Sequence, residues 1–195
     1  MADDIDKQKH ALRSTMRKAR REYAASLDDT TRALLLRRPP VPVMGMIPQG
    51  ATIGLYYETA GEAPARAYAR FLHEQGHIIA LPAYDSPDAP MHFREWTDPF
   101  GERDLEKGAF GPQPLAENGR IEPDVLFVPL VAFTDRGERM GQGGGFYDRW
   151  LAAHPDTSAI GLAWDIQLVE DLPVEAHDAP LMAIVTPTRL YGPFN

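Results

Sequence analysis

The sequence has 195 residues, no cysteine and a formal net charge of −8, so it forms neither disulfides nor thiolate metal sites and should repel nucleic acid. No apolar run approaches the length of a membrane span, and the acidic start Met1-Ala2-Asp3-Asp4 is unlike a secretory signal. We therefore expect one cytoplasmic domain over residues 1–195, a monomer or weak dimer that binds neither nucleic acid nor membrane.

The first 30 residues are expected to form a basic helical arm. Ten of the 20 Lys and Arg residues lie in residues 1–40, against six of the 28 Asp and Glu residues. A basic stripe lies beside an apolar one at helical spacing. The basic residues are Lys9, Arg13, Arg17 and Arg20 or Arg21, and the apolar ones are Leu12, Met16, Ala19 and Tyr23. Such a basic stripe is usually the solvated face of a helix, and the sequence alone favours that interpretation.

A proline-rich connector over residues 33–50 separates the arm from an alternating body. Strands are expected at 51–57, 77–83, 91–96, 124–130, 158–164 and 181–186, with helices at 63–75 and 147–153. The stretch from 97 to 123 is expected to be mostly loop. Strands and helices in alternation predict an α/β fold, a layered, mainly parallel sheet with helices on both faces and ligands at the carboxyl ends of the strands.

A glycine-rich loop follows the strand at 124–130 and precedes the last helix. It reads Arg139-Met140-Gly141-Gln142-Gly143-Gly144-Gly145-Phe146-Tyr147-Asp148-Arg149. Glycines let backbone N–H groups turn toward an anion, and the following helix N-terminus adds a partial positive charge, which favours the phosphates of a nucleoside triphosphate. The flanking arginines and Asp148 favour phosphate with a divalent cation. Neither a Walker loop nor a dinucleotide fingerprint matches, and a hairpin or Ω-loop without a ligand explains the composition equally well.

Motifs around this loop and elsewhere in the chain resemble those of a known family. They are Pro129-Leu130-Val131-Ala132-Phe133, Gly137-Glu138-Arg139-Met140-Gly141-Gln142-Gly143-Gly144-Gly145 and Phe146-Tyr147-Asp148-Arg149. Further matches in order are Lys9-x-x-x-Arg13, Gly61-Glu62, Leu81-Pro82, and Leu172-Pro173 through His177-Asp178. This set is similar to the signature of the 5-formyltetrahydrofolate cyclo-ligase (5,10-methenyltetrahydrofolate synthetase) family. The resemblance covers most of the chain and implies a layered domain of the phosphosugar-isomerase and CoA-transferase type.

The resemblance implies a ligase of one-carbon metabolism that uses ATP and Mg²⁺ to convert 5-formyltetrahydrofolate to 5,10-methenyltetrahydrofolate, with release of ADP and phosphate. It implies that the formyl oxygen is phosphorylated and that N10 then attacks the activated carbon, with no residue assigned as acid or base. The implied ATP-binding residues are Lys9, Arg13, Arg139, Met140, Gly141, Gln142, Gly143, Gly144, Gly145, Phe146 and Tyr147. The implied folate-binding residues are Tyr57, Glu62, Gln142 and Phe146, and the implied metal ligands are Asp148 and Asp178. Arg17, Arg20 and Arg21 are left on the solvated face of the helix.

Several of these residues also have plain structural explanations. Glu62 and Asp148 can be acids at helix starts, and Asp178 can be a turn residue. Two other classes of function stay open: a sugar-phosphate isomerase or CoA-transferase-fold enzyme that acts without ATP, and a noncatalytic folate- or nucleotide-binding module. The module is favoured by two departures from the family pattern, Phe146 in place of a common Tyr and Gln142 in place of Tyr, Lys or Arg.

Overall fold

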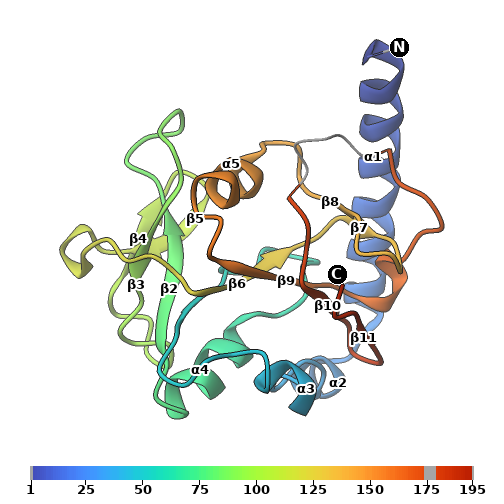
Figure 1. Cartoon of the computed structure of the whole chain (residues 1–195). Helices are drawn as coiled ribbons and strands as arrows, with labels where there is room; N and C mark the ends of the chain where they lie inside the picture. The colour runs from blue at the N-terminus through green and yellow to red at the C-terminus, as the bar shows by residue number, and fades with distance from the viewer. Residues whose placement is uncertain (1, 174–178, 195) are drawn as a thin grey trace.

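The structure, a computed structural model, describes residues 2–173 and 179–194 and is built on a seven-stranded sheet with the strand order β11-β10-β9-β6-β1-β2-β3 (Figure 1). The parallel central strands are β1 (Thr52–Gly54), β2 (Ile78–Ala83), β6 (Val125–Pro129), β9 (Ser158–Leu162) and β10 (Ala183–Val185). The antiparallel edge strands are β3 (His92–Glu95) and β11 (Leu190–Tyr191). The expected mainly parallel α/β sheet is therefore confirmed.

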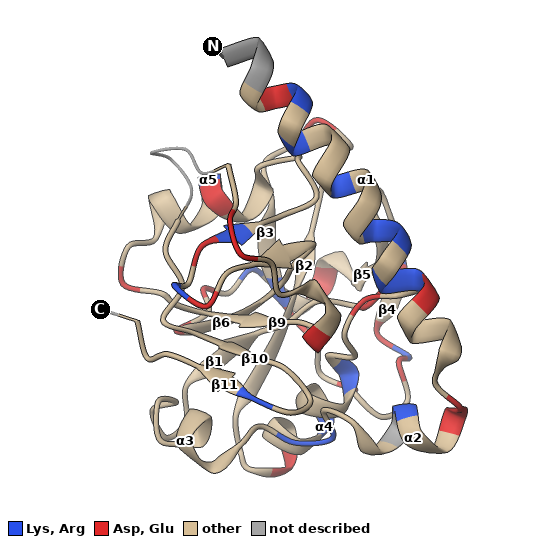
Figure 2. Cartoon of the chain, turned by 90° about the vertical axis from the view of Figure 1, so that its right-hand side faces the viewer, with Lys and Arg blue, Asp and Glu red and all other residues tan. Residues whose placement is uncertain are grey.

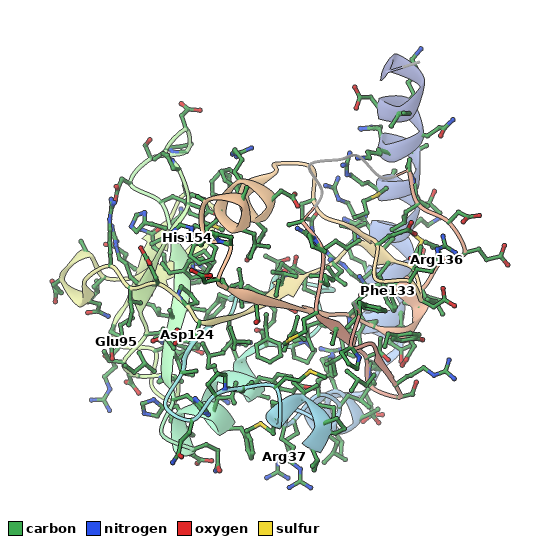
Figure 3. The ribbon with its side chains drawn as sticks, in the orientation of Figure 1. Arg37, Glu95, Asp124, Phe133, Arg136 and His154 are labelled. Carbon is green, nitrogen blue, oxygen red and sulfur yellow. The ribbon has the colours of Figure 1, made fainter. Side chains whose placement is uncertain are left out.

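Helices cover both faces of this sheet, because alternate side chains of the central strands point to opposite faces and most of them are apolar. On one face Phe127 of β6 meets Tyr68 with ring centroids 5.5 Å apart, and on the other Leu126 lies in the same cluster as Trp150. Figure 3 shows Phe133 among the packed side chains and Arg37 pointing out from the helical layer. The first face carries α2 (Asp29–Leu34), α3 (Val41–Met44) and α4 (Arg66–Glu74), and the second carries α5 (Phe146–Ala153) (Figure 1).

The long N-terminal helix α1 (Ala2–Ser26) runs along the side of the molecule rather than over a face of the sheet (Figures 1 and 2). Its Met16 packs in a small apolar cluster with Val131, Ala132 and Met140, which belong to the hairpin of β7 (Ala132–Phe133) and β8 (Arg139–Met140) or adjoin it. In the described part of the chain, no helix has both the length and the apolar character needed to cross a membrane. The contact between α1 and this hairpin sets the helix beside the glycine loop.

The expected strands and helices are all present, most of them shorter than expected, but the prediction of loop for residues 97–123 was wrong in part. This stretch holds an antiparallel hairpin of β4 (Leu105–Gly108) and β5 (Gly111–Pro114), followed by a short 3₁₀ helix, η1 (Ala116–Asn118). Its sequence lacks alternating apolar residues because the two strands pair only with each other, which also lets β5 carry Pro112 and Pro114. The β7–β8 hairpin, β11 and the 3₁₀ helix η2 (Asp165–Gln167) were also not expected, since each has too few residues to show a period.

Candidate active site

A cavity of about 620 Å³ opens at the carboxyl ends of β1, β2 and β6, between α1, the glycine loop and the β4–β5 hairpin. All the residues expected to bind ATP or folate line it, and so does Asp148. Asp178, the second expected metal ligand, lies outside the described residues. The lining residues for which these roles were expected come from α1, the segment after β1, and the stretch from β8 into α5: Lys9, Arg13, Tyr57, Glu62, Arg139, Met140, Gly141, Gln142, Gly143, Gly144, Gly145, Phe146, Tyr147 and Asp148.

The glycine loop over residues 141–145 connects β8 to α5. It was expected to follow the strand at 124–130 directly, but the β7–β8 hairpin lies between β6 and the loop. Gly143 has φ +100° and Gly145 has φ +62°, a region that residues with a side chain rarely adopt. A Cβ atom at Gly143 would lie 3.3 Å from the Arg13 guanidinium carbon. Among the described residues, no backbone hydrogen bond has the N–H of Gly143, Gly144 or Gly145 as donor. These N–H groups remain able to donate to a ligand in the cavity.

Helix α1 docks on this loop through its basic side chains. Arg13 Nε donates to the Gly141 carbonyl oxygen at 3.1 Å. Arg17 binds Gln142 twice, from Nε to Oε1 at 2.8 Å and from Nη2 to the carbonyl oxygen at 2.7 Å. Lys9 is also buried, at 5% exposed. The expectation that Arg17 belongs to the solvated face of the helix was therefore wrong in part, because its half-exposed side chain binds the loop, whereas Arg21 is exposed as expected.

Arg20 was also expected to be solvated, and this too was wrong, because the residue is 4% exposed. It lies four residues after Met16 and four before Ala24, both buried, so helical spacing places all three on the inner face of α1. Arg20 Nη1 donates to the Leu130 carbonyl oxygen at 3.0 Å and lies 3.7 Å from Glu62 Oε1. Burial lowers the pKa of Arg20, and the Glu62 carboxylate opposes that shift.

Glu62 presents a fixed carboxylate to the cavity. Its side chain is 8% exposed, and Oε2 accepts hydrogen bonds from the Thr59 backbone N–H at 2.9 Å and the Thr59 hydroxyl at 2.8 Å. Gln142 Nε2 lies 3.3 Å from the other oxygen, Oε1. The alternative that Glu62 is a helix-start acid is wrong, because Glu58 accepts the first N–H groups of α4, from Ala65 and Arg66. Glu62 therefore does not cap α4.

Two tyrosines beside Glu62 remain protonated well above neutral pH. Burial raises the pKa of the Tyr56 hydroxyl, and the Glu62 charge raises it further. Burial is likewise the main cause that raises the pKa of Tyr147, and Tyr84 and Glu62 raise it further. Both tyrosines line the cavity, and Tyr56 donates a hydrogen bond to the Ala63 carbonyl oxygen at 2.6 Å.

Asp148 in the first turn of α5 forms an ion pair with the buried Arg139 of β8. Both the Arg139 guanidinium and the backbone N–H of Ala179, at 3.3 Å, donate to Asp148 Oδ1. The buried Arg139 Nε has no hydrogen-bond partner. Within residues 2–173 and 179–194, no cluster of three or more His, Asp or Glu residues could hold a metal by itself. Mg²⁺ prefers oxygen ligands and can be held by one carboxylate together with phosphate oxygens and waters, so Asp148 has the chemistry to supply one such ligand.

An aromatic wall opposite α1 was not foreseen, apart from Phe146. Tyr84, just after β2, has its ring centroid 4.7 Å from Phe110 and 5.1 Å from Phe146, and the last two are 5.1 Å apart. Phe110 lies at the tip of the β4–β5 hairpin and is 53% exposed. The available signal was an aromatic residue between small ones in Ala109-Phe110-Gly111, which an exposed loop would not be expected to need. The wall offers flat apolar surface for a ring-containing ligand.

Comparison with known proteins identifies the family of this chain. The model of the 5-formyltetrahydrofolate cyclo-ligase family matches residues 5–187. A 5-formyltetrahydrofolate cyclo-ligase of Haemophilus influenzae is 36% identical over 151 residues, which cover 70% of this chain and 76% of the relative. The Escherichia coli K12 protein of the same name is 56% identical over 70 residues, only 35% of this chain and 38% of the relative. An NMR structure of Aquifex aeolicus 5,10-methenyltetrahydrofolate synthetase is 26% identical, with a TM-score of 0.71 over 94% of each chain. Because the family model spans most of the sequence, the chain belongs to the 5-formyltetrahydrofolate cyclo-ligase family.

Proposed function

We propose that this chain converts 5-formyltetrahydrofolate to 5,10-methenyltetrahydrofolate and that ATP is converted to ADP and phosphate in the same reaction. The observation that carries the proposal is the single cavity that a phosphate-type loop, a basic helix, a fixed carboxylate and an aromatic wall all line. Family membership and the names of the relatives support the same activity. Phe146 and Gln142, which favoured a noncatalytic module, both line this cavity and leave the aromatic wall and the loop contacts in place.

ATP would bind with its phosphates against the glycine loop. The N–H groups of residues 143–145 have no backbone acceptor among the described residues, and the N-terminus of α5 adds partial positive charge behind them. Lys9 and Arg13 from α1 and Arg139 from β8 bring cationic groups to the same wall. Since Arg13 is anchored to the loop through Nε, its terminal nitrogens are directed by a fixed stem, which suits bidentate phosphate binding.

The folate would occupy the opposite part of the cavity. Its ring system can stack on the wall of Tyr84, Phe110 and Phe146, and Tyr57 lines the same space. The Glu62 carboxylate can accept hydrogen bonds from ring N–H and amino groups, which fixes the orientation of the ring as well as adding affinity. Gln142 touches both Glu62 and Arg17, so it belongs to the boundary between the two substrates.

The reaction then needs positioning more than covalent help from the protein. The formyl oxygen on N5 attacks the γ-phosphorus of ATP, an O–P bond forms, and the bond to the ADP oxygen breaks. N10 attacks the activated formyl carbon, its proton passes to water, and phosphate leaves with the electron pair of the C–O bond, which gives the methenyl bridge. Cationic side chains and loop N–H groups hold the phosphates in line and neutralise the charge that shifts onto ADP.

Mg²⁺, held by Asp148 together with phosphate oxygens and waters, would neutralise further phosphate charge, and Asp178 is proposed as its second carboxylate. The chain's own share is to keep Asp148 in place. The first turn of α5 and the ion pair with Arg139 fix the Asp148 carboxylate beside the loop.

A spectroscopic assay tests this function. Formation of the methenyl product is followed in the near ultraviolet with 5-formyltetrahydrofolate present, and ATP or Mg²⁺ is omitted in parallel. We expect product only in the complete mixture. Turnover without ATP would favour an isomerase or transferase of the same layered fold, and binding of folate without turnover would favour a noncatalytic module.

A further inference from the structure

A buried guanidinium lies directly behind the carboxylate that faces the folate part of the cavity. Arg20 does not line the cavity, whereas Glu62 does. Arg20 Nη1 lies 3.7 Å from Glu62 Oε1, and these side chains are only 5% and 8% exposed. Within the described part of the chain, Glu62 is the acid with which Arg20 forms an ion pair. A charge this deeply buried requires a partner, so the two groups are tied to each other.

The other contacts of Arg20 do not account for an arginine at this position. Its Nε is buried and has no hydrogen-bond partner, which lowers the stability of the folded chain. Its hydrogen bond to the Leu130 carbonyl oxygen duplicates one from Gln167 Nε2, at 2.5 Å to the same oxygen. A buried ion pair can often be replaced by apolar residues without loss of stability. The contact that distinguishes Arg20 is therefore the one with Glu62.

The two oxygens of Glu62 are held in different ways. Oε2 accepts two short hydrogen bonds from Thr59, which occupy this oxygen. Oε1 lies 3.3 Å from Gln142 Nε2 and 3.7 Å from Arg20, so it feels a positive charge without a short hydrogen bond from Arg20. Thr59 fixes the rotation of the carboxylate, and Arg20 lies against the oxygen that still has capacity to accept a ligand N–H.

We propose that Arg20 is a positioning residue for substrate recognition: it orients Glu62 Oε1 toward the reduced pterin, an inference that rests on the proposed folate site. Arg20 touches neither substrate. Its effect reaches the folate through Glu62 alone, and ATP binding on the glycine loop does not depend on it.

Binding experiments on the full chain separate this role from a purely structural one. Titration with 5-formyltetrahydrofolate in the absence of ATP gives one Kd, and titration with a nonhydrolysable ATP analogue gives the other. We expect Arg20→Met, which keeps an unbranched apolar stem but removes the charged guanidinium, to raise the folate Kd about tenfold or more and to leave the ATP-analogue Kd within about twofold. Arg20→Lys restores the charge and should recover most of the folate affinity. Arg21→Gln, on the exposed face of the same helix, is the matched control and should change neither constant.

A double-mutant cycle with Glu62→Gln completes the test. If Arg20 acts through Glu62, Arg20→Met raises the folate Kd by less than about twofold in the Glu62→Gln background. An equal effect in both backgrounds, a parallel loss of ATP-analogue affinity, or no recovery with Arg20→Lys would overturn the inference. Should Arg20→Met not fold, Arg20→Gln, which is polar but uncharged, takes its place in both backgrounds with the same expected outcomes. If Glu62→Gln alone leaves the folate Kd unchanged, the proposed folate site itself fails; if it raises the Kd and Arg20→Met does not, only the role of Arg20 fails.

Discussion

The glycine-loop side of the cavity and its aromatic side are assembled from different kinds of groups. The first side uses backbone N–H groups and cationic side chains from one continuous segment and one helix. The second side brings together the rings of Tyr84, Phe110 and Phe146, which come from the end of a strand, the tip of a hairpin and the start of a helix. A short run of consecutive residues can therefore encode a phosphate-type loop. An aromatic wall, in contrast, forms only when the fold brings residues from separate segments together.

The two sides meet at Gln142. Its carbonyl and side-chain oxygens accept hydrogen bonds from Arg17, and its Nε2 lies 3.3 Å from Glu62 Oε1. Gln142 thus joins α1 and the glycine loop to Glu62, the carboxylate of the proposed folate side. Its place at this boundary explains how a residue that departs from the common family pattern can still be accommodated, because an amide offers both a donor and an acceptor.

The largest effect is expected from Asp148→Asn, on the glycine-loop side. The change removes a carboxylate from the proposed cation site and leaves the buried Arg139 without its ionic partner. Turnover should fall about 100-fold, and the free energy of unfolding should fall by about 3 kcal/mol. Product formation over a magnesium titration and urea unfolding measure the two effects.

Asp156→Asn is the matched control, because Asp156 is exposed beyond the other end of α5. It should leave both quantities within error. An unchanged rate for Asp148→Asn at limiting magnesium would contradict the assignment of Asp148 to the cation.

Arg13→Ala tests whether the two sides are separable. The loss of a guanidinium from the phosphate side should raise the KM for ATP about 10- to 100-fold, because charge-assisted hydrogen bonds are among the stronger ones. The KM for 5-formyltetrahydrofolate should change by less than about threefold. Lys18→Ala on the outer face of α1 is the control, since the Lys18 side chain is 73% exposed. Equal increases in both KM values would show that α1 organises the whole cavity and would break the comparison.

Phe110→Ala probes the aromatic side and should give the reverse pattern. Loss of the exposed ring should raise the KM for the folate about fivefold to tenfold, and the KM for ATP should stay within about twofold. Phe100→Ala is a suitable control, because Phe100 is 54% exposed and packs near Arg70 and His73 rather than at the cavity. If Phe110→Ala acted on ATP instead, the aromatic wall would belong to the nucleotide.

Much of the fold could be predicted from the sequence because its central strands carry continuous apolar runs. Residues 124–130 are apolar enough to require burial on both faces, which implies a covered parallel strand. The β4–β5 hairpin could not be predicted in this way. Its strands include Glu106, Lys107 and two prolines, and they are held by pairing with each other and by contacts of Gln113 with Tyr84 and Glu106.

The candidate site likewise has a part that could be predicted from the sequence and a part that could not. The glycine-loop residues and Asp148 could be named from one stretch of sequence, because glycines at positive φ beside a helix start have a direct physical meaning. Arg20 and Phe110 could not be named. The burial of Arg20 depends on the rotation of α1 against the β7–β8 hairpin, and the position of Phe110 depends on a hairpin with no apolar period. Long-range packing decides both.

The smallest effect at neutral pH is expected from Tyr84→Phe, which asks whether the aromatic side uses a hydroxyl or only a ring. Burial raises the pKa of Tyr84 to about 12, so its neutral form is favoured in the folded chain. The ring contacts with Phe110 and Phe146 survive the change, so both KM values at pH 7.5 should stay within about twofold.

The same substitution has a signature at high pH. A pKa that folding raises contributes stability that is fully present below the unfolded pKa of about 10 and is lost as pH rises toward 12. Wild type should therefore lose about 2 kcal/mol more than Tyr84→Phe between pH 10 and pH 12 in denaturant titrations, after allowance for partial solvent screening. A folate KM that rose about tenfold in Tyr84→Phe at pH 7.5 would mean that the Tyr84 hydroxyl forms a hydrogen bond with the substrate. The aromatic side would then bind through polar groups, as the glycine-loop side does, and not through its rings alone.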